Sequence, residues 1–283
     1  DELLPTGLEV SDHVHCDDTS ARHKGVAAIC THVGNELFAS FSTTGSKSRL
    51  NFLQLLSQPE ELYSWCEEAR TCLGLSGVAA RLIAKMEQIP EGTWAGRGAW
   101  EKQLDAWGLT DVDSRVAVSE AALCGTLLQR NWTENLGLVS DDAPQFKVFG
   151  FIHGLCWVHG ERKIDRLIPL TEPHREARKK ALERFWNIYK RLKAYRENPT
   201  PEEKVAIAVE FDDFCATKTG YADLNKALKL LHDKREGFLA VLEHPHLPQR
   251  NNLAESDIRE YARLRKISGC IASLETGRTC GRR

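Results

Sequence analysis

Residues 136–164 read LGLVSDDAPQFKVFGFIHGLCWVHGERKI, and the rest of the sequence is best interpreted outward from this stretch. It opens with a short run of branched apolar residues that ends on Asp141 and Asp142, which is typical of a buried strand closed by a polar turn. A second apolar run, residues 151–158, passes into a basic helix start at residues 159–163. Because α/β sheets bind ligands and metals at the ends of buried strands, Asp141 is the first candidate for a functional carboxylate.

Length and composition bound the class of protein. The chain has 283 residues, of which 42% are hydrophobic and 28% charged, so we expect a globular protein with one large domain or two modest ones. No apolar run reaches the ~18 residues of a membrane helix, and the acidic start, DELLPTGLEV, is unlike a signal peptide. Nine cysteines without paired spacing favour reduced thiols, which indicates a cytoplasmic protein.

The net charge is −2, but two stretches are basic. Residues 161–197 hold twelve Lys or Arg against six Asp or Glu, and residues 250–283 hold eight against four. Such stretches can contact nucleic-acid phosphates even in a nearly neutral chain. The alternative is that they are solvated helix faces.

The first part of the chain predicts strands followed by a helix. We predict three strands and a helix capped by Ser46, over residues 13–16, 26–33, 36–41 and 46–56. Gly34-Asn35 is a two-residue hairpin turn in this interpretation, and Asp17 closes the first strand as Asp141 closes the later one. The pattern predicts an α/β fold with a mixed sheet flanked by helices.

Residues 58–135 contain no convincing strand, so we predict an all-helical insertion between the third and fourth strands, with helices over residues 59–73, 76–88 and 113–129. Trp94, Trp100 and Trp107 are expected to form its core; stacking on nucleic-acid bases is the alternative. The C-terminal part is predicted to contain four helices. Three of them cover residues 171–195, 221–242 and 253–266, and the fourth, which comes second along the chain, begins at a cap on Thr200. We therefore divide one domain into a first half of the core (1–57), an insertion (58–135) and a second half with a helical extension (136–283).

The last predicted helix carries a carboxylate followed by three cations. Glu255, Arg259, Arg263 and Lys266 recur at i, i+4, i+8 and i+11 and share one face, whereas the residues that can pack inward are Leu253, Ile258, Tyr261 and Ala262. A carboxylate can hold a divalent metal, and cations can hold phosphates. The alternative is a surface helix with an i,i+4 Glu–Arg pair. With Asp17 and Asp141, Glu255 completes a three-carboxylate set sufficient for two Mg²⁺ ions about 4 Å apart, an arrangement suited to phosphoryl transfer.

The sequence resembles the DDE transposases with an RNase H-like fold, and within them the insertion-sequence family numbered sixty-six. The motifs that carry the resemblance are DDT at residues 17–19, VSDDAPQF at 139–146, LCWVHGER at 155–162, NNLAESDIR at 251–259 and RKISG at 265–269. The resemblance implies that Asp17, Asp141 and Glu255 are the catalytic, metal-binding residues, with Asp18 and Asp142 as the obvious misassignments. It implies two Mg²⁺ ions, for which Mn²⁺ can substitute.

The resemblance also implies the partners of the chain. We expect it to cut and join double-stranded DNA at element ends and target, as a homo-oligomer, in the cytoplasm and on the nucleoid. The side chains expected to contact DNA are Arg162, Lys163, Arg259, Arg263 and Lys266. Rival interpretations are an RNase H-like nuclease without joining activity and a truncated DNA-binding remnant without catalysis.

Cys156 and His159 match the CxxH signature that many such transposases carry, and we expect a structural role beside the sheet; half a zinc site is the alternative. Four other histidines could bind metal, although packing or surface roles are the preferred interpretation: His13, His15, His244 and His246. Arg250 stands where the family often has Asp.

Overall fold

The computed structural model describes residues 2–23, 26–130, 132, 135–268 and 280–281, and side chains are described except at residues 23, 265–268 and 280–281. The chain forms two compact units. The first unit contains residues 1–136, 143–151 and 253–283, and the second contains residues 137–142 and 152–252. Both contain helices and strands, so the predicted α/β class is confirmed at this level.

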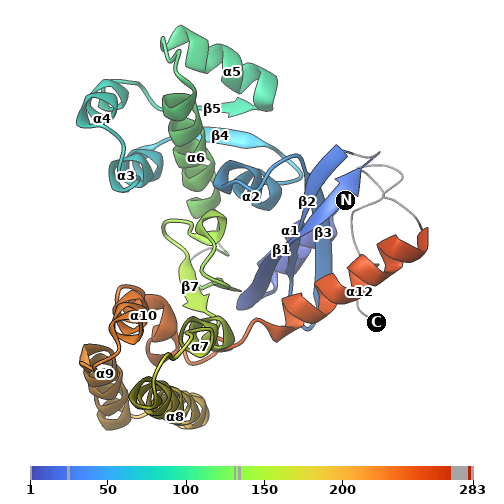
Figure 1. Cartoon of the computed structure of the whole chain (residues 1–283). Coiled ribbons are helices and arrows are strands. Elements are labelled where there is room, and N and C mark those ends of the chain that lie inside the picture. Colours follow the sequence, from blue (N-terminus) through green and yellow to red (C-terminus); the bar gives the residue numbers. More distant parts are fainter. Residues whose placement is uncertain (1, 24–25, 131, 133–134, 269–279, 282–283) are drawn as a thin grey trace. The chain divides into compact units, whose positions relative to one another are not determined.

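The first unit is built on an antiparallel sheet of β1 (His13–His23), β2 (Val26–Gly34) and β3 (Phe38–Thr44), shown in blue in Figure 1. A short strand, β8 (Cys280–Gly281), pairs with the start of β3, and α1 (Leu3–Glu9) precedes the sheet. The prediction that the first strand ends before Asp17 is wrong, because β1 continues through eleven residues. The predicted hairpin turn is also shifted: Gly34 still belongs to β2, and the turn comprises residues 35–37.

Helix α2 (Arg49–Leu56) follows the sheet as predicted, but its cap is Ser48 rather than Ser46. The Ser48 hydroxyl accepts a hydrogen bond from the Asn51 amide at 3.2 Å, which satisfies one of the amides that a helix start leaves unpaired. Leu53 and Leu56 are buried on its inner face.

The prediction of an all-helical segment at residues 58–135 is wrong. Two four-residue strands, β4 (Leu62–Trp65) and β5 (Gly92–Ala95), form an antiparallel pair among four helices, α3 (Glu67–Leu75), α4 (Ala80–Glu87), α5 (Arg97–Ala106) and α6 (Val112–Leu128). The strands are too short to show a clear alternation, and aromatic packing stabilises them: the Tyr63 ring stacks on Trp100 with centroids 4.8 Å apart. The predicted tryptophan core is confirmed, because Trp100 also packs against Trp94 and Trp107.

The second unit contains a parallel strand pair and a helical bundle. Strands β6 (Gly137–Ser140) and β7 (Ile152–Leu155) pair in parallel. The helices are α7 (Trp157–Asp165), α8 (Glu172–Glu197), α9 (Pro201–Ala216), α10 (Ala222–His232), α11 (Arg235–Phe238) and the 3₁₀ turn η2 (Ala240–Leu242). The Thr200 hydroxyl caps α9 as predicted, accepting a hydrogen bond from the Glu203 amide. The single helix predicted over residues 221–242 is interrupted, because the chain turns at residues 233–234 and again after α11.

The core of this bundle is aromatic. Trp157 is fully buried at the start of α7, where its ring lies 4.6 Å from that of Phe185 and 5.7 Å from that of Phe238, centroid to centroid. Arg250 packs against aromatic side chains of the bundle. Its guanidinium lies over the rings of Tyr189 and Trp186, 4.8 and 5.6 Å from their centroids. This cation–π contact gives Arg250 a packing role beside the bundle.

Helix α12 (Asn252–Ser268) returns to the first unit and runs along the β1–β3 sheet (Figure 1). Across the described part of the chain, no helix combines the length and the apolar character needed to cross a membrane. Among the seven cysteines whose side chains are described, none forms a disulfide and all are buried.

Candidate active site

Asp17 belongs to a row of side chains that crosses the sheet of the first unit. In the antiparallel register, Asp17 lies opposite His32 on β2, and His32 lies opposite Phe41 on β3. Residues directly opposite one another in antiparallel strands point to the same face. Asp17, His32 and Phe41 therefore share one face of the sheet.

Helix α12 packs on this same face. His32 Nε2 lies 2.9 Å from Asp257 Oδ2, and Phe41 stacks on Tyr261 with ring centroids 4.2 Å apart. Tyr261 also packs, with Ile258, against a buried cluster of mostly small residues on the sheet: Ala21, Ala28, Cys30, Ala39 and Phe41. The predicted inward positions of Ile258 and Tyr261 are confirmed.

Glu255 lies in the first turn of α12, two residues before Asp257. Its helix is thus fixed to the face of the sheet that carries Asp17, and both residues belong to the first unit. Sequence reasoning missed His32 and Asp257. The available signal was the i,i+4 spacing of Asp257 and Tyr261, which places the carboxylate on the inward side of the helix.

Replacing Asp257 by Ala is expected to loosen α12. His32 is fully buried, so the loss of its carboxylate partner leaves a buried imidazole without this contact, at a cost of about 1–3 kcal/mol. Hydrogen exchange of the α12 amides should quicken, and urea unfolding should show the loss of stability. Asp257→Asn is the matched control, because it keeps an oxygen atom and the side-chain volume at this position and removes only the negative charge. Unchanged exchange in Asp257→Ala would show that the contact between His32 and Asp257 does not hold the helix.

Asp18 points to the opposite face from Asp17 and has a different environment. Its Oδ1 accepts from Thr31 Oγ1 at 2.5 Å, its Oδ2 accepts from Gln145 Nε2 at 2.6 Å, and Lys47 Nζ lies 3.8 Å away. The side chain is only 3% exposed. These contacts explain why β1 runs past Asp17: the carboxylate of Asp18 is satisfied inside the unit and does not need a turn to reach water.

The carboxylates also affect a neighbouring thiol. Cys16 is fully buried, and its pKa is raised by burial first and then by the negative charges of Asp18 and Asp17. The thiol therefore remains protonated and unreactive near neutral pH.

Asp141 directly follows the last residue of β6 in the second unit, as predicted. Its neighbour Asp142 forms ion pairs with Lys163, at 3.5 Å, and with Lys234. The Asp142 side chain is 14% exposed, and both of its lysine partners belong to the same unit. Lys163, a predicted DNA contact, is engaged with Asp142 in the structure.

The other predicted DNA contacts differ in how far they are exposed. Arg162 donates a hydrogen bond to Nε2 of His159 at 3.0 Å near the end of α7. Arg259 and Arg263 are exposed on α12, and Arg263 pairs with Glu260 at 2.6 Å. Lys266 belongs to α12, but its side chain lies outside the described residues.

Cys156 has a structural position. It is the N-cap residue of α7, is 1% exposed, and its sulfur accepts the Asn251 backbone amide at 3.3 Å. The sulfur thus joins the CxxH segment to the segment before α12. Among the described residues, Cys156 and His159 do not belong to a group of three or more potential metal ligands.

Comparison with known proteins identifies the family of the chain. The family model described as "Transposase IS66 family" matches residues 126–279, more than half of the chain, so the chain belongs to this family of transposases and is a DNA-acting protein. The chain is also 33% identical over 276 residues to "Uncharacterized protein y4jO" of Sinorhizobium fredii (strain NBRC 101917 / NGR234), a match that covers 96% of this chain and 85% of that protein. No solved structure matches the sequence. The resemblance to the insertion-sequence family numbered sixty-six is confirmed.

Proposed function

We propose that this chain is the catalytic core of a DDE transposase with an RNase H-like arrangement, which cleaves double-stranded DNA and joins the freed 3′ end to target DNA. The observation that carries the proposal is the packing of α12, with Glu255 in its first turn, on the face of the sheet that carries Asp17. Asp141 is proposed as the third carboxylate from the VSDDAPQF motif alone, in which it directly follows β6.

Asp17, Asp141 and Glu255 would hold two Mg²⁺ ions. The donor set fits this metal, because all three residues offer carboxylate oxygens, the ligands that Mg²⁺ prefers. The adjacent carboxylates already have other partners in the structure. Asp18 accepts hydrogen bonds from Thr31 and Gln145, and Asp142 forms ion pairs with two lysines. When bound, such a metal pair activates an attacking oxygen and stabilises the leaving oxygen of a phosphoryl transfer.

The basic residues of α12 would position DNA. Arg259 and Arg263 follow Glu255 by one and two turns and are exposed, so their guanidinium groups can contact backbone phosphates beside the carboxylates. Lys266 would extend this row, and Arg162 would contribute from α7. We expect the active form to be a homo-oligomer that holds two element ends.

Product analysis tests this function against its rivals. The chain is incubated with Mg²⁺, a supercoiled plasmid and a labelled duplex taken from the end of its insertion sequence. Label covalently joined to the plasmid supports the transposase. Cleaved DNA without joined product would indicate the nuclease, and retarded but intact DNA would indicate the non-catalytic remnant; either result would overturn the proposal.

A further inference from the structure

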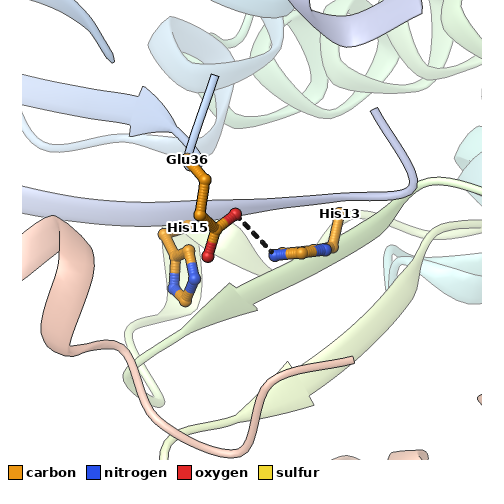
Figure 2. A group of neighbouring side chains, drawn as sticks. All are labelled: His13, His15 and Glu36. Atoms are coloured by element: carbon orange, nitrogen blue, oxygen red, sulfur yellow. Dashed lines mark ion pairs between the residues drawn. The ribbon is translucent and has the colours of Figure 1, made fainter. Parts of the chain in front are cut away.

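His13 and His15, for which sequence reasoning preferred a packing or surface role over metal binding, lie beside Glu36 in the first unit (Figure 2). The two histidines alternate on β1 and therefore point to the same face of the strand. One ligand atom from each of the three side chains lies within 4.8 Å of the other two. Two imidazoles and a carboxylate thus converge from two separate elements, the start of β1 and the β2–β3 turn.

The turn is anchored so that Glu36 stays beside His13. The Asn35 side chain is buried and donates to the His13 carbonyl at 3.0 Å and to Ser11 Oγ at 2.7 Å. Its own Oδ1 accepts from the Leu37 amide at 2.9 Å. The bond to His13 ties the turn to β1, and the bond from Leu37 closes the turn around Glu36, so the backbone of Glu36 is held beside His13.

Asp12 orients the imidazole of His13. Asp12 Oδ1 lies 2.7 Å from His13 Nδ1, and His13 Nε2 faces Glu36 Oε2 at 3.5 Å. A hydrogen bond from Nδ1 to a carboxylate orients the ring and favours the tautomer that leaves Nε2 as the ligand atom. Carboxylate–histidine–metal relays in metalloproteins use this arrangement.

We propose that His13, His15 and Glu36 bind a transition-metal ion of the Zn²⁺ class, with water completing the coordination. Two imidazoles and one carboxylate with an open position form a recurrent Zn²⁺ ligand set. Ligand bonds of about 2.0–2.1 Å in tetrahedral geometry separate two ligand atoms by about 3.3 Å, close to the 3.5 Å between His13 Nε2 and Glu36 Oε2. The Glu36 side chain is 68% exposed and can adjust, whereas His15 is 3% exposed and fixed.

This metal site differs from the proposed Mg²⁺ site in position and in chemistry. Asp17 is two residues beyond His15 on β1, about 7 Å along the strand. Nitrogen donors select Zn²⁺-class ions, whereas the all-carboxylate set selects Mg²⁺. A bound ion would join the start of β1 to the β2–β3 turn and thereby stiffen the strand that carries Asp17.

Zinc binding to the untagged full chain, stripped with EDTA, tests the proposal. Competition with a chromophoric chelator should show one Zn²⁺ site per chain, and Zn²⁺ should raise the melting temperature because it binds the folded state. Asp12→Asn should weaken binding about 10–100-fold, and Glu36→Gln at least as much, without unfolding the chain. His232→Gln, which changes an exposed histidine on α10, is the matched control and should bind as wild type.

Spectroscopy of the Co²⁺-loaded chain separates this site from any thiolate site. Nitrogen and oxygen ligands should give visible d–d bands without a sulfur-to-metal charge-transfer band, and Cys156→Ser should leave the spectrum unchanged. Excess Mg²⁺ should not displace the ion. The proposal is overturned if Zn²⁺ does not bind, if Glu36→Gln and Asp12→Asn bind as tightly as wild type, or if the spectrum shows thiolate ligation.

Discussion

Replacing Asp17 by Asn should lower the rate of DNA cleavage and joining by at least about 10³-fold while leaving the chain folded. The amide has the shape of the carboxylate but lacks the charge that holds a divalent metal. A metal ion that stabilises the charge of the transition state lowers the barrier by several kcal/mol, so its loss slows the reaction by this factor. Asp141→Asn and Glu255→Gln should have effects of the same size if the three residues form one site. Initial rates of joined-product formation at saturating Mg²⁺ measure the loss.

Asp18→Asn is the matched control for this prediction. Asp18 lies next to Asp17, but its two carboxylate oxygens accept hydrogen bonds from Thr31 and Gln145 on the other face of the sheet. In Asp18→Asn an NH₂ group replaces one of these oxygens and would face a hydrogen-bond donor. We expect a loss of about 1.5–3 kcal/mol in the free energy of unfolding, with the activity of the folded fraction retained. An active Asp17→Asn variant, or a stable Asp18→Asn variant that is inactive, would show that the catalytic carboxylate has been misassigned.

Replacing Trp157 by Ala should cost about 3–5 kcal/mol of stability in the second unit. The ring is fully buried, packs against four aromatic rings, and donates a hydrogen bond from Nε1 to the Phe238 carbonyl at 3.0 Å. Its loss leaves a large cavity and removes the indole donor from a buried carbonyl. Since many domains are stable by only ~5–15 kcal/mol, this change should bring the helical bundle close to unfolding.

The effect of Trp157→Ala is measured by urea unfolding, with limited proteolysis within α8 and α9 as the readout of the unfolded second unit. Trp157→Phe serves as the control, because it keeps most of the ring packing and loses only the hydrogen bond and part of the volume. Its cost should be less than half that of the Ala variant. Equal costs would mean that the hydrogen bond to Phe238, rather than ring packing, dominates at this position.

The parts of the fold with a clear period could be predicted from the sequence. The apolar spacing on α12 predicted that Ile258 and Tyr261 face inward, and the Thr200 signature predicted the start of α9. Strands β4 and β5 have four residues each, too few to show alternation, and they depend on aromatic contacts made by distant residues such as Trp100. Local patterns could not reveal these contacts.

The candidate site shows the same division. The motifs identified Asp17, Asp141 and Glu255 as candidates, but the partners that distinguish them from their neighbours come from elsewhere in the chain. Gln145 donates a hydrogen bond to Asp18, 127 residues earlier in the sequence, and Lys234 forms an ion pair with Asp142, 92 residues earlier. For the same reason, Lys163 was predicted only as a DNA contact, although it pairs with Asp142.

The histidines of β1 illustrate a limit of motif reasoning. His13 and His15 lie two residues apart in a predicted strand, but nothing in the sequence marked Glu36 as their neighbour. That proximity depends on the Asn35 side chain, which fixes the hairpin turn against β1.

Iron-directed cleavage of the polypeptide tests the central claim most directly. Fe²⁺ replaces Mg²⁺ in the full chain, and ascorbate with peroxide then generates radicals that cut the backbone next to the bound ion. The Glu36→Gln variant is used, so that the proposed histidine site contributes little. We predict cuts beside Asp17, Asp141 and Glu255 together, all suppressed by excess Mg²⁺. Cuts at only one of these positions, or cuts that Mg²⁺ does not suppress, would contradict a shared metal site and with it the DDE assignment.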